Sequence, residues 1–531
     1  MTADQGSRTA APPAAGRDRT AGPDRAAGPD RAVGTRTDAL AAGAAGLVAA
    51  LVFLVVRGSL IDDAYITLSY ARNLAEHAHW GLTSYRTVNS ATSPLNVLVL
   101  GLATFVVRNP VAGLGVVFVL TNAAQAWGLA RLARALRLGP AAVVLGVGLV
   151  LLSPLMLSIV GMEMALALAL LVWLTVAAVE GRPVLFGLVT AALVLTRVDL
   201  AVFPLVLLLA AGRVRRHTPT VLAVAVVAAL PWYVFSWFAL GALVPDTLVI
   251  KTAAGQAWGI WHFGNGPRLF LDRYRTATVL SALPALGGLL ALLAWFGARA
   301  WRRPRWAGLG PVAALGVGGV LHYLAYTLLA PPPFHWYYAP SVGALTLTLA
   351  LAAGAATRRP AGADQPATRR RPGVPAVALA AVCALLVAAD VGFAAQRPWP
   401  WREAPVMTNW AAPGQYLDAG EALRGQVSGE VVRSPGEIGT LAYACRCDIV
   451  DVFSDPGSLQ PYIDQRRRDA GPLMRLFLRL DLANRDRVPA AVPTVAVDWA
   501  PGAPPGPGVW RIDSNWRGPG VLVLHGLPGS P

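Results

Sequence analysis

The sequence predicts an all-α polytopic membrane protein with about 11–13 transmembrane helices and a small C-terminal α/β domain outside the cytoplasm. Hydrophobic residues make up 55% of the 531-residue chain and charged residues only 14%, whereas soluble domains carry about 25% charged residues. Long apolar segments recur from residue 38 to residue 394, with short loops between them, as in helical membrane proteins. After residue 394 the sequence turns mixed and polar.

The N-terminal tail, residues 1–37, is rich in Ala, Gly, Pro and Arg and repeats the pentapeptide GPDRA. Too few large apolar side chains are present to offset the entropy lost on ordering, so we expect a disordered tail. The apolar run that follows, 38–56, is longer than the core of a signal peptide. Because arginines precede it, we expect a signal anchor with a cytoplasmic N-terminus.

Arginine clusters at 131–137, 213–217, 299–306 and 357–372 are expected to face the cytoplasm. The apolar segments between the clusters predict ten further spans, near 111–130, 140–158, 162–180, 183–196, 199–212, 219–240, 278–298, 308–329, 338–356 and 374–394. An odd total of about eleven crossings puts the C-terminal domain outside the cell, on a multi-pass protein of the plasma membrane.

Two places depart from regular spans. The segment 94–107 is too short to cross comfortably, and we expect it to enter the membrane only in part. Spans 183–196 and 199–212 are also short, with Arg197 and Asp199 at their hinge. Polar groups at a broken helix usually line a cavity, because lipid cannot satisfy freed backbone groups.

The sequence therefore divides into the tail at 1–37, a transmembrane domain at 38–394 and an extracytoplasmic domain at 395–531. In the last part, the alternating stretches VPTVAVDW and GVLVLHGL predict strands. Cys383 lies in an apolar span, and the spacing of Cys445 and Cys447 is too short for an ordinary unstrained bridge, so we expect no disulfide.

The net charge of +16 does not indicate nucleic-acid binding, because the arginines lie in the tail and loops and are not interleaved with exposed aromatic residues. Of the 45 basic residues, only Lys251 is a lysine. Its compact ammonium suits an anion such as phosphate. The alternative is that Lys251 reaches from the membrane interface into water.

Asp62 and Asp63 follow the first span directly and begin a predicted helix at 64–78. They could cap that helix, where its dipole favours acids. Neighbouring carboxylates repel, however, unless a cation or ordered donors compensate. The doublet therefore points to a catalytic pair that meets a substrate hydroxyl, or to ligands of a divalent cation.

Other polar groups are expected on the same side of the membrane. Glu163 stands at the start of a span, where an acid is costly enough to suggest a role. Arg197 could pair with Asp199 or contact substrate. His335, Tyr337 and Tyr338, in the segment FHWYYAP, could form an aromatic belt or bind a sugar or lipid phosphate.

These segments, taken in order, resemble a known family. IDDAYITLSYARNLAEHAHWG, TSPL, GMEMALAL, LTRVDL, VPDTLVIK, HWYYAP and SPGEIGTLAYACRCDIVDVFSDPG make the chain similar to the GT-C membrane glycosyltransferases. Within these it is most similar to the actinobacterial decaprenyl-phosphoryl-arabinose-dependent arabinofuranosyltransferases of cell-wall biogenesis. The chain departs from that pattern at Met164, Val198 and Asp246.

The resemblance implies transfer of a sugar, arabinofuranose first and mannose or another hexose second, from a polyprenyl phosphate to a cell-envelope glycan. It implies catalysis by Asp62 and Asp63 and donor-phosphate or substrate binding by Lys251, Arg197 and Glu163. A flippase for lipid-linked sugars is the alternative, but it predicts paired broken helices, and only one candidate pair occurs in the sequence. A scaffold without catalysis would not explain why the polar groups share one side.

Overall fold

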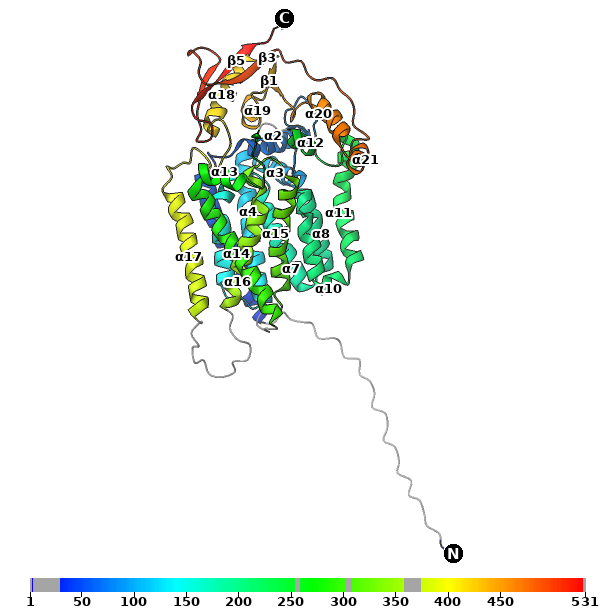
Figure 1. Cartoon of the computed structure of the whole chain (residues 1–531), viewed down its shortest axis with the longest axis vertical. Helices are drawn as coiled ribbons and strands as arrows, with labels where there is room; N and C mark the ends of the chain where they lie inside the picture. The colour runs from blue at the N-terminus through cyan, green and yellow to red at the C-terminus, as the bar shows by residue number, and fades with distance from the viewer. Residues whose placement is uncertain (1, 3–28, 254–257, 302–307, 358–373, 529–531) are drawn as a thin grey trace.

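The computed structural model describes residue 2 and residues 29–253, 258–301, 308–357 and 374–528. Most of the predicted tail at 1–37, and most of the arginine clusters at 299–306 and 357–372, lie outside these residues. The described part is a bundle of long helices with the C-terminal elements stacked on one end of it (Figure 1). We call this end the capped end of the bundle.

Within the described ranges, seven helices are long and apolar enough to cross a membrane. The protein is thus a multi-pass membrane protein, as predicted. These helices are α1 Pro29–Val56, α4 Pro110–Ala135, α11 Thr218–Ala239, α14 Arg275–Ala300, α15 Gly310–Leu329, α16 Ala339–Ala356 and α17 Val374–Ala395.

The other predicted spans are also helical but shorter. They are α5 Ala141–Leu151, α7 Met164–Glu180, α8 Pro183–Thr196 and α9 Val202–Ala210, the last preceded by η1 Val198–Ala201 and followed by α10 Gly212–Arg215. The predicted span 140–158 is divided, because Pro154 starts a new short helix, α6 Pro154–Ser158. Segment 94–107 is the helix α3 Pro94–Val107, whose 14 residues are fewer than a spanning helix needs.

Short helices cover the capped end of the bundle. They are α2 Asp62–His77, α12 Thr247–Ala253, α13 Gly266–Arg273 and the single turn η4 His335–Tyr337. Helix α2 packs on α3 below it and on the C-terminal helix α19 Gly439–Cys445 above it (Figure 1). It is therefore the layer that joins the membrane part to the C-terminal part.

The C-terminal part combines helices with one five-stranded sheet, as the sequence predicts. Its other elements are α18 Pro413–Gln426, β1 Val431–Arg433, β2 Asp448–Val450, α20 Pro456–Asp469, α21 Pro472–Asp481, β3 Val495–Ala500, β4 Val509–Ile512 and β5 Gly520–Gly526. The strand order is β2-β1-β3-β5-β4, with β1 parallel to both its neighbours and β5 antiparallel to β3 and β4. Both predicted strands are present, as β3 and β5.

Helix α19 rests on α2 at very short range. A Cβ atom on Gly439, the first residue of α19, would lie 2.1 Å from the carbonyl oxygen of Asp62. Only glycine permits this approach. Apolar side chains of α2, α18, α19 and the sheet then form one buried cluster, which includes Tyr70, Tyr416, Leu441 and Leu522. The C-terminal part is fixed to the bundle by a continuous core.

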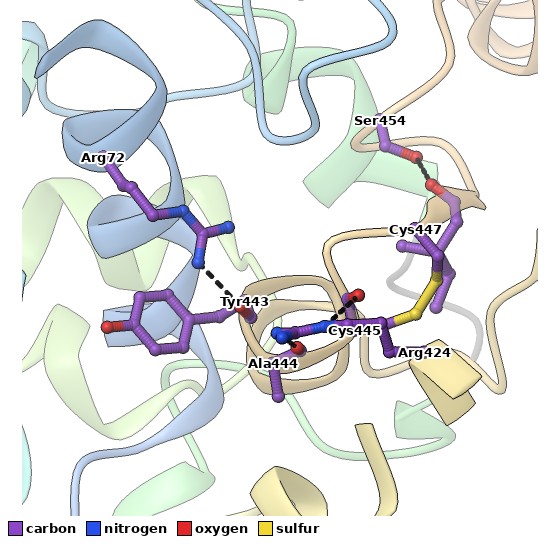
Figure 2. Close-up of a disulfide and its surroundings, with 8 residues drawn as sticks. Arg72, Arg424, Tyr443, Ala444, Cys445, Cys447 and Ser454 are labelled. Atoms are coloured by element: carbon purple, nitrogen blue, oxygen red, sulfur yellow. Dashed lines mark hydrogen bonds between the residues drawn. A yellow bond between two sulfur atoms is a disulfide. The ribbon is translucent and has the colours of Figure 1, made fainter. Parts of the chain in front are cut away.

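The expectation that Cys445 and Cys447 do not bridge is wrong. The two residues form a disulfide where α19 ends, with their Cα atoms 5.1 Å apart (Figure 2). Arg446 between them adopts a left-handed conformation with φ of +53°. This turns the chain so sharply that the flanking Cα atoms come within the usual bridging distance. The sequence spacing alone does not reveal such a turn.

Candidate active site

A small polar cavity opens at the capped end of the bundle, between the membrane helices and the C-terminal part. Four of the predicted site residues line it: Asp63, Glu163, Arg197 and Lys251. They come from α2, from the residue before α7, from the residue after α8, and from α12. The remaining lining residues are Ile66, Thr67, Ser90, Ala91, Thr92, Ser93, Val97, Met162, Thr247 and Phe453. Segments that lie far apart in the sequence thus meet at one site.

Arg197 is the centre of a buried ion network. Its Nη1 donates to Glu163 at 3.0 Å, and its Nε and Nη2 donate to the two oxygens of Asp199 at 2.9 and 2.8 Å. Nη2 also lies 2.7 Å from the Tyr326 hydroxyl. Most of the guanidinium donors are therefore already engaged within the protein. The internal Arg197–Asp199 pair, one of the two predicted roles for Arg197, is present.

Lys251 is placed differently from Arg197. Its Nζ lies over three aromatic rings, 5.0 Å from the centre of Tyr337, 5.8 Å from Trp336 and 6.0 Å from Phe334. Among the residues that the structure describes, no carboxylate forms an ion pair with it. The rings attract the ammonium by their quadrupoles without using its hydrogen-bond donors. Lys251 can therefore offer those donors to an anion in the cavity.

Asp63 faces the same cavity as Lys251. Burial raises the pKa of the Asp63 carboxyl to about 7, although the nearby Lys251 charge acts to lower it. Burial in turn lowers the pKa of the Lys251 ammonium, while Asp63 acts to raise it. A carboxyl group with a pKa near neutrality can exchange protons at physiological pH. The cavity thus holds one proton acceptor and one available cation.

Asp62 points away from this cavity, although it is adjacent in sequence. Its two carboxylate oxygens accept hydrogen bonds from the backbone N–H groups of Gly439, at 2.9 Å, and Thr440, at 2.7 Å. It therefore caps α19 and not its own helix, whose N-cap residue is Ile61. The two carboxylates of the predicted pair therefore have different surroundings, Asp62 at the start of α19 and Asp63 at the cavity.

No set of three or more metal-binding side chains gathers among the described residues.

The segment FHWYYAP, residues 334–340, contacts Lys251 with some of its side chains and an apolar groove with others. Tyr337 and Trp336 face Lys251, whereas His335 and Tyr338 line the groove. The groove runs between α14, α15 and α16, and it encloses about 1230 Å³ including its open side. The predicted aromatic cluster is therefore divided between the surroundings of Lys251 and the apolar groove.

His335 and Tyr338 differ in their polar contacts. The Tyr338 hydroxyl donates to the Phe263 carbonyl oxygen at 2.6 Å. His335 is only 1% exposed, and neither ring nitrogen has a hydrogen-bond partner. Burial lowers its pKa to about 3, so the imidazole is neutral at physiological pH. Its ring is thus a buried, unpaired polar group in the wall of the groove.

Sequence reasoning missed two members of the Arg197 network. Tyr326 donates to Asp199 at 2.6 Å, and His322 Nε2 lies 3.1 Å from the same carboxylate. Both belong to α15 and face α9 and η1. The available signal was His322, a histidine inside an otherwise apolar span, since ionisable residues within membrane helices are usually functional or paired.

No family model matches the chain, and no curated protein matches it. Two solved structures of ArnT from Cupriavidus metallidurans are similar in fold. The one bound to undecaprenyl phosphate is 14% identical, covers 91% of this chain and 97% of its own, and has a TM-score of 0.51. The apo structure is 15% identical over the same shares of both chains, with a TM-score of 0.49. At this identity, the likeness to the lipid-bound structure shows the fold alone: this chain shares the fold of that ArnT structure.

Proposed function

We propose that this protein is a membrane glycosyltransferase that moves a sugar from a polyprenyl-phosphate donor to a glycan of the cell envelope. The observation that carries the proposal is the polar cavity, in which Asp63 and the available ammonium of Lys251 face one another. Transfer of a sugar from a phosphate ester needs two groups at one place. They are a proton acceptor for the incoming hydroxyl and a cation for the departing phosphate.

The fold adds support for a lipid-linked donor. The ArnT structure that shares this fold was solved with undecaprenyl phosphate bound. In the present chain, the apolar groove between α14, α15 and α16 begins next to η4, whose other side faces Lys251. We propose that the prenyl chain lies in this groove, while the phosphate reaches Lys251 and the sugar enters the polar cavity.

The reaction then divides into defined roles. The acceptor hydroxyl oxygen forms a bond to the anomeric carbon, and the bond from that carbon to the phosphate oxygen breaks. Asp63 takes the hydroxyl proton, and polyprenyl phosphate leaves as an anion beside Lys251. Phosphate is a good leaving group, so the step needs no strong general acid. Arg197 and Glu163 hold the cavity wall in place through their mutual ion pair.

If the product retains the donor's anomeric configuration, Asp63 is instead the nucleophile and forms a covalent sugar intermediate. Determining the product configuration by NMR therefore chooses between the two roles. Asp62 is proposed as a positioning residue, because its contacts with α19 hold the start of α2, on which Asp63 sits.

The finer assignment follows the family resemblance. We propose arabinofuranose as the sugar, with mannose or another hexose as the second candidate, and a cell-wall glycan as the acceptor. We place the site on the outer face of the plasma membrane. The disulfide at the end of α19 favours an oxidising compartment for the C-terminal part. The Arg-bearing α10 lies at the opposite end of the bundle, which favours that end for the cytoplasm (Figure 1).

Sugar transfer by the purified full chain tests this proposal. The donors are radiolabelled polyprenyl-phosphate arabinofuranose and polyprenyl-phosphate mannose, and the acceptor is an arabinan oligosaccharide. We expect Asp63→Asn to lower the transfer rate by about 100-fold or more, the usual contribution of a general base. The matched control is Glu421→Gln, which neutralises an exposed acid on α18 and is expected to leave the rate unchanged.

The mechanism is wrong if Asp63→Asn transfers sugar at the wild-type rate. The class of enzyme is wrong if the wild-type protein transfers neither sugar, yet moves the lipid-linked donor between the leaflets of a vesicle. That second result would favour the flippase.

A further inference from the structure

Helix α21 exposes an apolar stripe that no part of the described protein covers. Leu473, Leu476, Phe477 and Leu480 are 82%, 52%, 37% and 57% exposed. Their spacing of i, i+3, i+4 and i+7 places them on one face of the helix. Four large apolar side chains in one such stripe call for a partner surface.

The opposite face of α21 is already used inside the protein. Leu478 is buried and, with Leu482 just after the helix, packs in a cluster with Val249 and Ile250 of α12 and Ile463 of α20. The exposed stripe is therefore a second apolar surface, separate from the one that holds α21 to the C-terminal part.

The position of α21 identifies what this second surface meets. The Nε1 atom of Trp237, in the last turn of the spanning helix α11, donates to the Leu480 carbonyl oxygen at 3.1 Å. Its neighbour Phe238 is 67% exposed. In Figure 1, α21 lies beside the capped end of α11. The stripe thus continues the lipid-facing surface of α11 at the depth where that helix leaves the membrane.

Charge on the same part of the surface completes the pattern. Arg479 borders the stripe. Arg475 lies farther round α21 and donates to the Ala470 carbonyl oxygen at 3.0 Å, and Arg468 lies at the end of α20, just before α21. All three arginines are exposed. None forms an ion pair with another described residue. An apolar stripe with bordering cations is the pattern of a helix that lies in the membrane interface, where arginines reach lipid phosphates.

We propose that α21 is an interfacial helix that binds the membrane surface, with its stripe among the upper acyl chains and its arginines on anionic lipid headgroups. The binding surface is distinct from the candidate active site and does not depend on sugar transfer. Membrane binding by α21 holds in place the segment that carries Lys251.

Two contacts connect that segment to the last residue of α21 and to the turn that follows it. Asp481 accepts hydrogen bonds from the backbone N–H groups of Leu243, at 2.8 Å, and Val244, at 2.9 Å. Arg485 donates to Asp246 at 2.7 Å, immediately before α12 begins. A helix held in the lipid surface therefore also holds the start of α12.

Fluorescence quenching in vesicles tests the proposal. The full chain, in a Cys383→Ser background, carries Leu476→Cys labelled with the environment-sensitive dye NBD. It is reconstituted in phosphatidylglycerol vesicles that contain lipids spin-labelled near the headgroup end of the acyl chain. We expect a several-fold larger fractional quenching than for the same dye at Glu421→Cys, an exposed position on α18.

Two results would overturn the proposal. Quenching of the Leu476 label by aqueous iodide but not by the lipid probe would place α21 in water. Shielding from both quenchers would mean that a protein surface, such as a second copy of the chain, covers the stripe.

A second comparison tests the arginines. We expect the Leu476 label to be quenched more strongly in phosphatidylglycerol than in phosphatidylcholine vesicles, and the difference to disappear in Arg475→Gln/Arg479→Gln. Equal quenching in both lipids for the parent protein would show that the charge part of the proposal is wrong.

Discussion

Two adjacent aspartates have different environments, and this difference decides what each can do. Asp63 faces a cavity with a cation, whereas Asp62 is held by two backbone amides of α19. We therefore expect replacements at the two positions to affect different properties, Asp63 the chemistry and Asp62 the stability.

The first prediction is a pH profile for sugar transfer. Because burial raises the pKa of Asp63 to about 7, its basic form is lost as the pH falls through this value. The rate should decrease about tenfold per pH unit below pH 6 and level off above pH 8. The dependence of kcat/KM on pH, at saturating acceptor, measures this. A rate that is constant between pH 5 and pH 8 would contradict the role of Asp63 as base.

The second prediction concerns the stability of Asp62 variants. Asp62→Ala removes the acceptor for two buried N–H groups, and hydrogen bonds to a charged group contribute about 1.5–3 kcal/mol each. The unfolding temperature of the protein in detergent should therefore fall by several degrees. Asp63→Asn is the control, because its side chain makes no hydrogen bond to another described side chain, and its unfolding temperature should stay close to that of the wild type.

The third prediction concerns Lys251. Lys251→Met keeps a long apolar side chain over the aromatic rings but removes the ammonium, so the KM for the lipid donor should rise about tenfold or more, while the KM for the acceptor should change little. Lys251→Arg should restore part of the donor affinity. Equal donor KM values for Lys251→Met and the wild type would place the phosphate elsewhere.

At the scale of the elements, the contact between α2 and α19 is the most sensitive part of the fold. Gly439→Ala would put a methyl group 2.1 Å from a backbone oxygen that cannot move aside. The two helices must then separate, at a cost of about 1–3 kcal/mol.

We therefore expect this variant to unfold at a lower temperature. Gly425→Ala is a matched control within α18, since a Cβ atom there meets no other atom within 4 Å. It should be neutral or slightly stabilising, because alanine favours helix. A smaller loss for Gly439→Ala than for Gly425→Ala would contradict the close packing of α19 on α2.

The elements themselves were largely predictable, whereas their partners were not. Apolar runs and arginine clusters located the spans, and alternation located β3 and β5. In contrast, the partner of Asp62 lies 377 residues away, and the left-handed turn at Arg446 depends on tertiary packing that no local pattern encodes. For the same reason, the sequence grouped His335 with Tyr337, although the two side chains face opposite sides of η4.

The residue type at position 246 is explained by a contact with a residue far away in the sequence. Asp246 is one of the positions at which the chain departs from the pattern of the family that its sequence resembles. The structure pairs this acid with Arg485 at 2.7 Å, and the two side chains are only 5% and 8% exposed. Removing one partner of a buried pair leaves an uncompensated charge. The acid at position 246 therefore depends on the arginine at position 485, and a change at one position requires a change at the other.

At the scale of the whole molecule, the arrangement depends on which end of the bundle faces outward. Two single cysteines, Glu421→Cys on α18 and Arg216→Cys after α10, lie at opposite ends of the bundle (Figure 1). In intact cells of a Cys383→Ser background, a membrane-impermeant thiol reagent should label the first and label the second only after the membrane is opened. The reverse order would place the C-terminal part in the cytoplasm and would remove the proposed acceptor.

The position of η4 has a consequence for how substrates and products reach and leave the site. One of its sides lines the apolar groove between α14, α15 and α16, and the other contacts Lys251, which lines the polar cavity. On the proposed function, the spent carrier can drift back into the bilayer while the lengthened polysaccharide stays in the aqueous space. The lipid carrier and the polysaccharide then enter and leave the site by different routes, so release of one product does not depend on release of the other.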